Sequence, residues 1–118
     1  MKKIYHLATC DTCKRIINEL QVPDSFQKQE IKQEEITVKQ LEELKELAGS
    51  YEALFSKRAK LYKERGLKDE VFSEDDFKRF ILEHYTFLKR PVIVNEGEIF
   101  IGNSKKVVAA AKASIHPS

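Results

Sequence analysis

Two cysteines separated by two residues, Cys10 and Cys13, stand near the start of the chain between a predicted strand and a predicted helix. Residues 3–7 alternate and carry apolar side chains, as a short buried strand does. Beyond the cysteines, apolar side chains recur at helical spacing until the chain reaches Pro23. A chain that opens with strand, cysteine turn and helix is expected to belong to the α/β class.

The middle of the chain is predicted to be helical. Thr37 and Gln40 form a capping-box pattern before an apolar face that ends at Gly49. Residues 50–66 suit two short helical pieces, and Ser73 is placed to cap a further helix with acidic residues in its first turn.

The remaining segments suit strands and one last helix. Residues 26–31 form a mostly polar second strand, which fits the edge of a sheet. Pro91 precedes a hairpin with strands at 92–94 and 98–101, and Asn103 or Ser104 caps the last helix.

The order β-α-β, helical block, β-β-α is that of a thioredoxin-like α/β fold, with a mixed sheet between helices. The helical block, at about residues 37–88, is then an insertion. A chain of 118 residues is near the usual size of one domain. We therefore expect a single thioredoxin-like domain over residues 1–118.

Composition narrows the function and the compartment. The 21 basic and 19 acidic residues give a formal charge of +2, too small to predict direct binding of nucleic acid. No apolar run approaches the roughly 20 residues that span a bilayer, and no signal peptide is expected. Paired cysteines without a secretion signal predict a reduced dithiol in the cytoplasm.

The cysteine turn is the candidate reactive centre. A cysteine at the start of a helix loses its proton more easily, so Cys10 is the candidate nucleophile. Cys13, about one helical turn further on, is the candidate resolving thiol. The alternative is half of a zinc site. Because His6, His84 and His116 are the only other soft ligands and no second cysteine pair exists, we favour redox chemistry and expect neither a metal nor a tightly bound cofactor.

Positive charge is expected around the sulfur of Cys10. His6, at the end of the first strand, would stabilise a thiolate as an imidazolium, or it makes a structural hydrogen bond. Lys14 and Arg15 add positive potential, although a solvated helix face explains them nearly as well.

Two arginines are candidate anion ligands. Arg90 precedes Pro91, and a proline that opens a strand beside a thiol turn suits a cis peptide bond, which would present backbone to a thiol substrate. The planar forks of Arg90 and Arg58 would bind an oxyanion or carboxylate in a bidentate manner. For each arginine the alternative is a surface ion pair.

Taken together, these residues resemble the arsenate reductase family, with its Spx-like regulators and its small glutathione-dependent reductase-like proteins. The resemblance covers essentially the whole chain. It rests on Ile4-Tyr5-His6 before Cys10, Ser56-Lys57-Arg58 followed by Tyr62 and Gly66-Leu67, Arg90-Pro91, and Ile101-Gly102 before the last helix.

The resemblance implies a nucleophile at Cys10, a cis Pro91, and Arg58 and Arg90 near the sulfur. In the glutathione-linked arsenate reductases the cysteine attacks arsenate, glutathione attacks the adduct, and arginines hold the anion. Those enzymes typically carry a third arginine where this chain has Gly102, and a serine where it has Cys13. The dithiol is closer to the Spx-like branch, whose members bind the C-terminal domain of the RNA polymerase alpha subunit and usually have a longer tail.

Three functions are therefore compatible with the sequence. The leading hypothesis is a thiol-dependent reductase of arsenate or of a disulfide, with glutathione, glutaredoxin or thioredoxin as reductant. The alternatives are a redox-sensing partner of the RNA polymerase alpha subunit and a non-catalytic adaptor.

Overall fold

In the computed structural model, which describes residues 1–117, the chain divides into two compact units. The sheet unit consists, among the described residues, of 1–34 and 90–117. The helical unit consists of residues 35–89 and corresponds closely to the predicted insertion. Whether the two units together form one domain stays a prediction.

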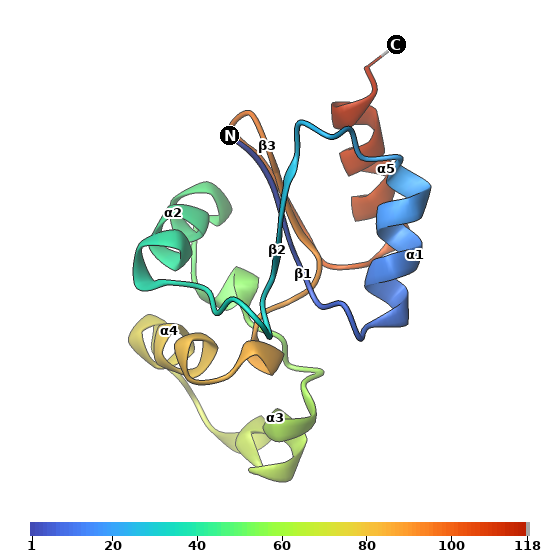
Figure 1. Ribbon diagram of the computed structural model, residues 1–118. Helices are drawn as coiled ribbons and strands as arrows, with labels where there is room; N and C mark the ends of the chain where they lie inside the picture. The colour runs from blue at the N-terminus through green and yellow to red at the C-terminus, as the bar shows by residue number, and fades with distance from the viewer. Residues whose placement is uncertain (118) are drawn as a thin grey trace. The chain divides into compact units, whose positions relative to one another are not determined.

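The sheet unit contains four strands, β1 (Lys2–His6), β2 (Gln27–Glu30), β3 (Val92–Asn95) and β4 (Glu98–Ile101). They lie in the order β2-β1-β3-β4, with β1 parallel to β2 and antiparallel to β3 (Figure 1). The mixed sheet is therefore confirmed, and so is the place of the polar strand β2 at an edge. The first strand ends one residue earlier than its apolar pattern predicts.

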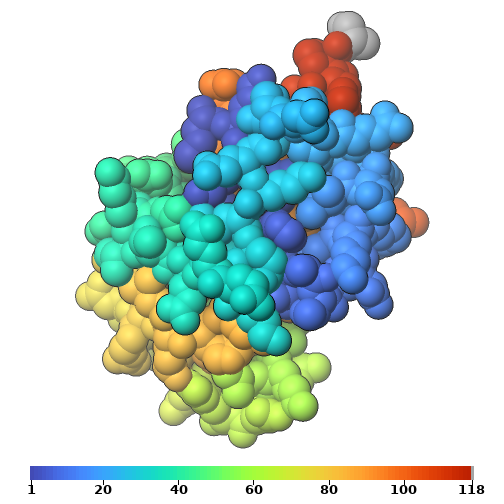
Figure 2. Space-filling view, viewed as in Figure 1, coloured from blue at the N-terminus to red at the C-terminus, as the bar shows by residue number. Residues whose placement is uncertain are grey.

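Two helices pack together against this sheet. Helices α1 (Asp11–Leu20) and α5 (Lys105–Ile115) contact each other, and both lie on one face of the sheet (Figure 1). A buried cluster joins the three elements, and its members are Ile4, Ile16, Leu20, Phe26, Ile93, Val108 and Ala111. The outer side of α1 lies at the surface in the space-filling view, coloured mid-blue (Figure 2). This packing fixes the start of α1 at the end of β1.

The helical unit contains α2 (Val38–Ala48), α3 (Lys60–Glu64) and α4 (Glu74–Glu83), with 3-10 turns at Glu52–Leu54, Leu67–Asp69 and Tyr85–Phe87. Its core is aromatic. The ring of Phe55 stacks on Phe87 with centroids 5.4 Å apart and lies 4.9 Å from the ring of Phe77. Two short helical pieces over residues 50–66 were expected, and the structure has a 3-10 turn and α3 there.

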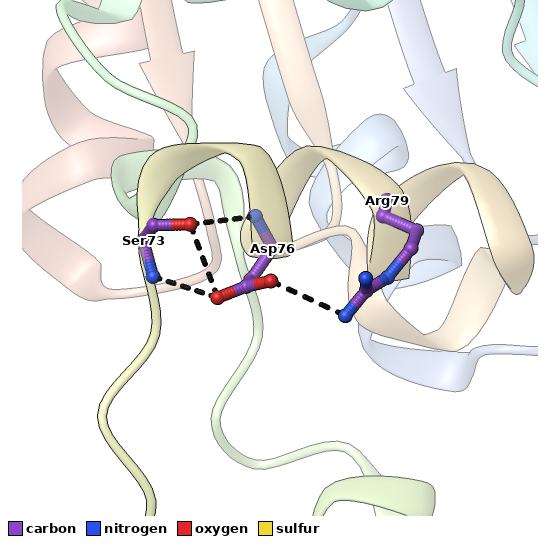
Figure 3. Close-up of polar contacts among 3 residues, drawn as sticks. All are labelled: Ser73, Asp76 and Arg79. Carbon is purple, nitrogen blue, oxygen red and sulfur yellow. Dashed lines mark hydrogen bonds and ion pairs between the residues drawn. The ribbon is translucent and has the colours of Figure 1, made fainter.

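The predicted helix caps are present. The capping box of Thr37 and Gln40 opens α2, and Ser104, one of the two candidates, caps α5. At α4, Ser73 Oγ accepts the N–H of Asp76 at 3.3 Å, while the Asp76 carboxylate accepts the N–H of Ser73 at 2.9 Å (Figure 3). Arg79 pairs with the second oxygen of Asp76 at 3.2 Å. Both hydrogen bonds of the capping box are therefore present at the start of α4.

Candidate active site

Cys10 is the residue that immediately precedes α1. A turn at residues 7–10 follows β1 and is closed by the N–H of Cys10, which donates to the carbonyl of Leu7 at 3.1 Å. The carbonyl of Cys10 accepts the N–H of Lys14 at 3.1 Å, so the helix begins at once. The side chain of Cys10, the N-cap residue of α1, is partly exposed. Its thiol is thus held at the positive end of a helix.

The pKa of the Cys10 thiol lies below its ordinary value. Partial burial alone would raise it, but hydrogen bonds from the backbone N–H and the thiol of Cys13 oppose burial, together with the charge of Arg90 and the N–H of Thr12. These groups favour the thiolate, because donors and a cation stabilise negative charge on sulfur. The site therefore has the electrostatics of a nucleophilic cysteine.

Cys13 is fully buried in the first turn of α1, and its exposed fraction is 0%. Burial is the main cause that raises the pKa of the Cys13 thiol to about 11. The hydrogen bond to the Cys10 side chain and the negative charge of the Cys10 thiolate raise it further. A backbone hydrogen bond from Leu7 and the charge of Arg90 act in the opposite direction. A thiol with this pKa stays protonated near neutral pH. It can donate its proton in a hydrogen bond to the Cys10 sulfur.

Arg90 and Pro91 lie where the chain enters β3, the neighbour of β1. The peptide bond between them is cis, as the position of Pro91 before a strand predicts. Pro91 is buried, and its carbonyl accepts the N–H of Gly102 at 2.9 Å. Arg90 lies close enough to lower the pKa of both cysteines. The structure thus brings this arginine to the dithiol.

His6 lies beside Glu30 in the register of β1 and β2. Burial lowers the pKa of its imidazole, the charge of Glu30 raises it, and Lys28 lowers it, with a net fall. Neutral imidazole is thus the main form near neutral pH. The stabilisation of the Cys10 thiolate by an imidazolium of His6 stays a prediction.

The other predicted ligands are less closely defined. Lys14 lies exposed on α1, next to the buried Cys13. Arg58 lies exposed in the helical unit, in the turn before α3. Their binding of an anion stays a prediction.

One residue with contacts to the cysteine turn was missed. Glu30 accepts the N–H of Ala8 at 3.4 Å, two residues before Cys10. Its position in a polar strand made it look like a solvated surface residue. The only available signal was that β1 and β2 are parallel neighbours, because this brings their ends to one edge of the sheet.

Two further features bear on the site and the class of protein. Within residues 1–117, no three His, Cys, Asp or Glu side chains gather in a way that would hold a metal ion. In the same part of the chain no helix has the length and apolar character needed to cross a membrane.

Most of the chain matches the model of a known protein family. The model of the ArsC family matches residues 5–111. The chain belongs to the ArsC family. No curated protein sequence matches it significantly.

Solved structures have the same fold as this ArsC family chain. Arsenate reductase from Vibrio cholerae is 23% identical, with a TM-score of 0.75 over 93% of this chain and 96% of that one. An arsenate reductase (ArsC) related protein from Brucella melitensis is 21% identical, with a TM-score of 0.70 and 92% of both chains covered. A protein named YFFB is 18% identical, with a TM-score of 0.77, and the match covers 98% of this chain and 100% of that one.

Family membership supports a thiol-based, reductase-like protein. The arsenate reductases of this family act on an oxyanion with thiol reductants of the glutathione, glutaredoxin or thioredoxin type. The structural similarity to these solved structures over nearly their whole length shows the thioredoxin-like fold of this chain.

Proposed function

We propose that this protein is a thiol-dependent reductase in which Cys10 is the nucleophile and Cys13 the resolving thiol. The observation that supports this most directly is the pair of opposite pKa shifts. The pKa of Cys10 is lowered and that of Cys13 is raised to about 11, within a single helical turn. One sulfur is therefore prepared to attack while the other keeps its proton.

With a disulfide substrate, the reaction needs two exchange steps. The Cys10 thiolate attacks one sulfur, forms a mixed disulfide and expels the other sulfur as a thiolate. Cys13 then gives up its proton to that thiolate or to water and attacks the sulfur of Cys10. The second thiol of the substrate leaves, and Cys10 and Cys13 are joined by a disulfide. Two molecules of glutathione, or the dithiol of thioredoxin or glutaredoxin, restore the reduced pair and become oxidised themselves.

With arsenate, the Cys10 thiolate would form a sulfur–arsenic bond and displace a hydroxyl group, which takes a proton from solvent and leaves as water. Attack on the Cys10 sulfur by glutathione or Cys13 would then break that bond and leave both electrons on arsenic, so that arsenite departs. Arg90 and Arg58 are the proposed anion ligands, with Lys14 as a further cation. An oxyanion is usually held by several charged donors, and this chain offers only two candidate arginines for it. We therefore expect arsenate to be a poorer substrate than a disulfide.

The test is a pair of turnover assays with the reduced protein. One follows reduction of the mixed disulfide of glutathione and a small thiol, with glutathione or thioredoxin as reductant, and the other follows arsenite release with glutathione and glutaredoxin. Disulfide turnover that disappears in Cys10→Ser supports the proposal. Absence of turnover in both assays contradicts it.

The alternative, a redox-sensing regulator, has one feature in its favour, the dithiol itself. It is tested with the C-terminal domain of the RNA polymerase alpha subunit as bait, for both reduced and oxidised protein. Capture without turnover would favour the regulator. If neither capture nor turnover is observed, the non-catalytic adaptor is the remaining function.

A further inference from the structure

Glu30 is the last residue of β2, at the same edge of the sheet as the cysteine turn. It stands opposite His6, the last residue of β1, in the parallel register. The chain that leaves β1 therefore turns beside the carboxylate of Glu30. This turn, residues 7–10, ends at Cys10.

The carboxylate of Glu30 accepts three backbone N–H groups. Oε1 accepts Ala8 at 3.4 Å and Lys32 at 3.0 Å, while Oε2 accepts Gln33 at 3.1 Å. Two of these bonds lie within the turn after β2, which the N–H of Glu34 also closes by donating to the Glu30 carbonyl at 2.8 Å. The bond to Ala8 is different, because it joins this hydrogen-bonded turn to the cysteine turn.

Glu30 is suited to hold these groups as an anion. Removal from water alone would raise the pKa of its carboxyl. The hydrogen bonds from Lys32, Ala8 and Gln33 outweigh that effect and lower the pKa, and the charge that His6 carries at acidic pH, where a carboxyl titrates, adds to the fall. The carboxylate is thus ionised near neutral pH. Hydrogen bonds to an ionised acceptor are stronger than those to a neutral one.

The place of the Cys10 sulfur depends on the turn that carries it. Its thiolate is stabilised by the N–H groups of Thr12 and Cys13 and by the charge of Arg90. These groups belong to α1 and to the start of β3, whereas the backbone that leads into Cys10 is the turn held through Ala8. Loosening of the turn would let the sulfur move away from its donors and so disfavour the thiolate.

We propose that Glu30 is a positioning residue for Cys10, and that it acts by holding the Ala8 N–H and thereby the turn that aims the sulfur at the start of α1. This inference rests on the proposed role of Cys10 as the nucleophile. It makes a prediction with a definite sign. Through space alone, the negative charge of Glu30 disfavours a nearby thiolate, so its removal would lower the pKa of Cys10, whereas loss of positioning raises it.

The experiment compares Glu30→Ala and Glu30→Gln with the wild type, and uses Glu34→Gln as the matched control. Glu34 is an exposed carboxylate at the end of the same turn. The pH dependence of Cys10 alkylation by iodoacetamide is followed by peptide mass spectrometry, and hydrogen exchange of the Ala8 amide by NMR. Both readouts use the full chain and need no substrate.

Positioning predicts that Glu30→Ala raises the pKa of Cys10 and slows its alkylation at pH 6 by roughly three- to tenfold, since one pKa unit changes the thiolate fraction about tenfold. Glu30→Gln keeps an acceptor oxygen but also loses the charge, so the pKa of Cys10 should be lower in Glu30→Gln than in Glu30→Ala. Exchange of the Ala8 amide should be fastest in Glu30→Ala and intermediate in Glu30→Gln. Glu34→Gln should match the wild type in both.

A pKa of Cys10 that falls, or does not change, in Glu30→Ala would overturn the proposal, whatever happens to stability or to Ala8. If Glu30→Ala does not fold, Glu30→Asp decides in its place, because it keeps the charge on a side chain one methylene shorter; a pKa of Cys10 that does not rise in Glu30→Asp would then overturn the proposal. Failure of the proposed function has a separate signature. The wild type would then show no turnover, although its Cys10 alkylation could still depend on Glu30.

Discussion

The thiols of Cys10 and Cys13 are hydrogen-bonded to each other across the first turn of α1, and their pKa values shift in opposite directions. When the pair carries a single proton, that proton resides on the buried Cys13. Its S–H then stabilises the negative charge on Cys10. The buried thiol thus supports the reactive one before it takes any chemical part.

The first prediction concerns the order of alkylation. At mildly acidic pH, iodoacetamide should label Cys10 well before Cys13, because the pKa of Cys10 is lowered and that of Cys13 is about 11. As the pH rises, labelling of Cys13 should stay slow because its side chain is fully buried. Peptide mass spectrometry measures both sites in one sample. Preferential labelling of Cys13 would reverse the assigned roles.

The second prediction concerns the mixed disulfide. In Cys13→Ser, treatment with oxidised glutathione should leave an adduct that accumulates on Cys10, because the thiol that would release it is missing. In Cys10→Ser no adduct should form readily on Cys13. Intact-mass spectrometry after peroxide or glutathione treatment distinguishes the adduct from an internal disulfide. Failure of the wild type to form a Cys10–Cys13 disulfide under any oxidant would make the dithiol incidental.

Much of the fold could be predicted because its signals are local. The caps at Thr37, Ser73 and Ser104 and the order of helices and strands follow from hydrogen-bonding side chains and apolar periodicity over a few residues. The 3-10 turn at Tyr85–Phe87 was not predicted. A single short turn has no period to detect.

The candidate site was only partly predictable, since it depends on which strands are neighbours. The electrostatic effect of Arg90 on the cysteines follows from the pairing of β1 with β3, which no local pattern specifies. Glu30 was missed for the same reason. For His6, proximity in sequence to Cys10 suggested a cation, whereas burial lowers its pKa and favours the neutral ring.

The third prediction separates the charge of Arg90 from its shape. Arg90→Gln should raise the pKa of Cys10, because the positive charge that lowers it is gone. Arg90→Lys should largely preserve that pKa but weaken arsenate binding, because an ammonium group cannot present a planar fork. Alkylation against pH measures the first effect, and arsenate protection of Cys10 from alkylation measures the second.

Arg15→Lys is the control for both readouts, since Arg15 is an exposed arginine of α1. It should change neither the pKa of Cys10 nor protection by arsenate. Equal protection by arsenate in the wild type and Arg90→Lys would argue against an anion site at Arg90.

The last prediction concerns the cap of α4 and its dependence on pH. Ser73→Ala should lower the free energy of unfolding by about 1 kcal/mol, the usual cost of losing a helix N-cap. Asp76→Asn should also destabilise the fold at pH 7, because the fold stabilises the ionised Asp76 carboxylate. Hydrogen bonds from the N–H and Oγ of Ser73 lower the pKa of this carboxyl below its ordinary value of 3.8. Burial opposes this fall, and the charge of Arg79 adds to it.

A carboxyl with a lowered pKa in the folded state stabilises the fold above its pKa in the unfolded chain. That contribution is lost as the pH falls through the folded value. The difference between the wild type and Asp76→Asn should therefore be largest at neutral pH and shrink as the pH falls below about 4. Urea unfolding at a series of pH values measures it. Arg79→Gln removes an exposed ion pair with Asp76 and the guanidinium over the ring of Phe80, and it should have the smaller effect at pH 7. If the deficit of Asp76→Asn were constant from pH 7 to pH 2, its origin would be the shape of the side chain rather than the charge.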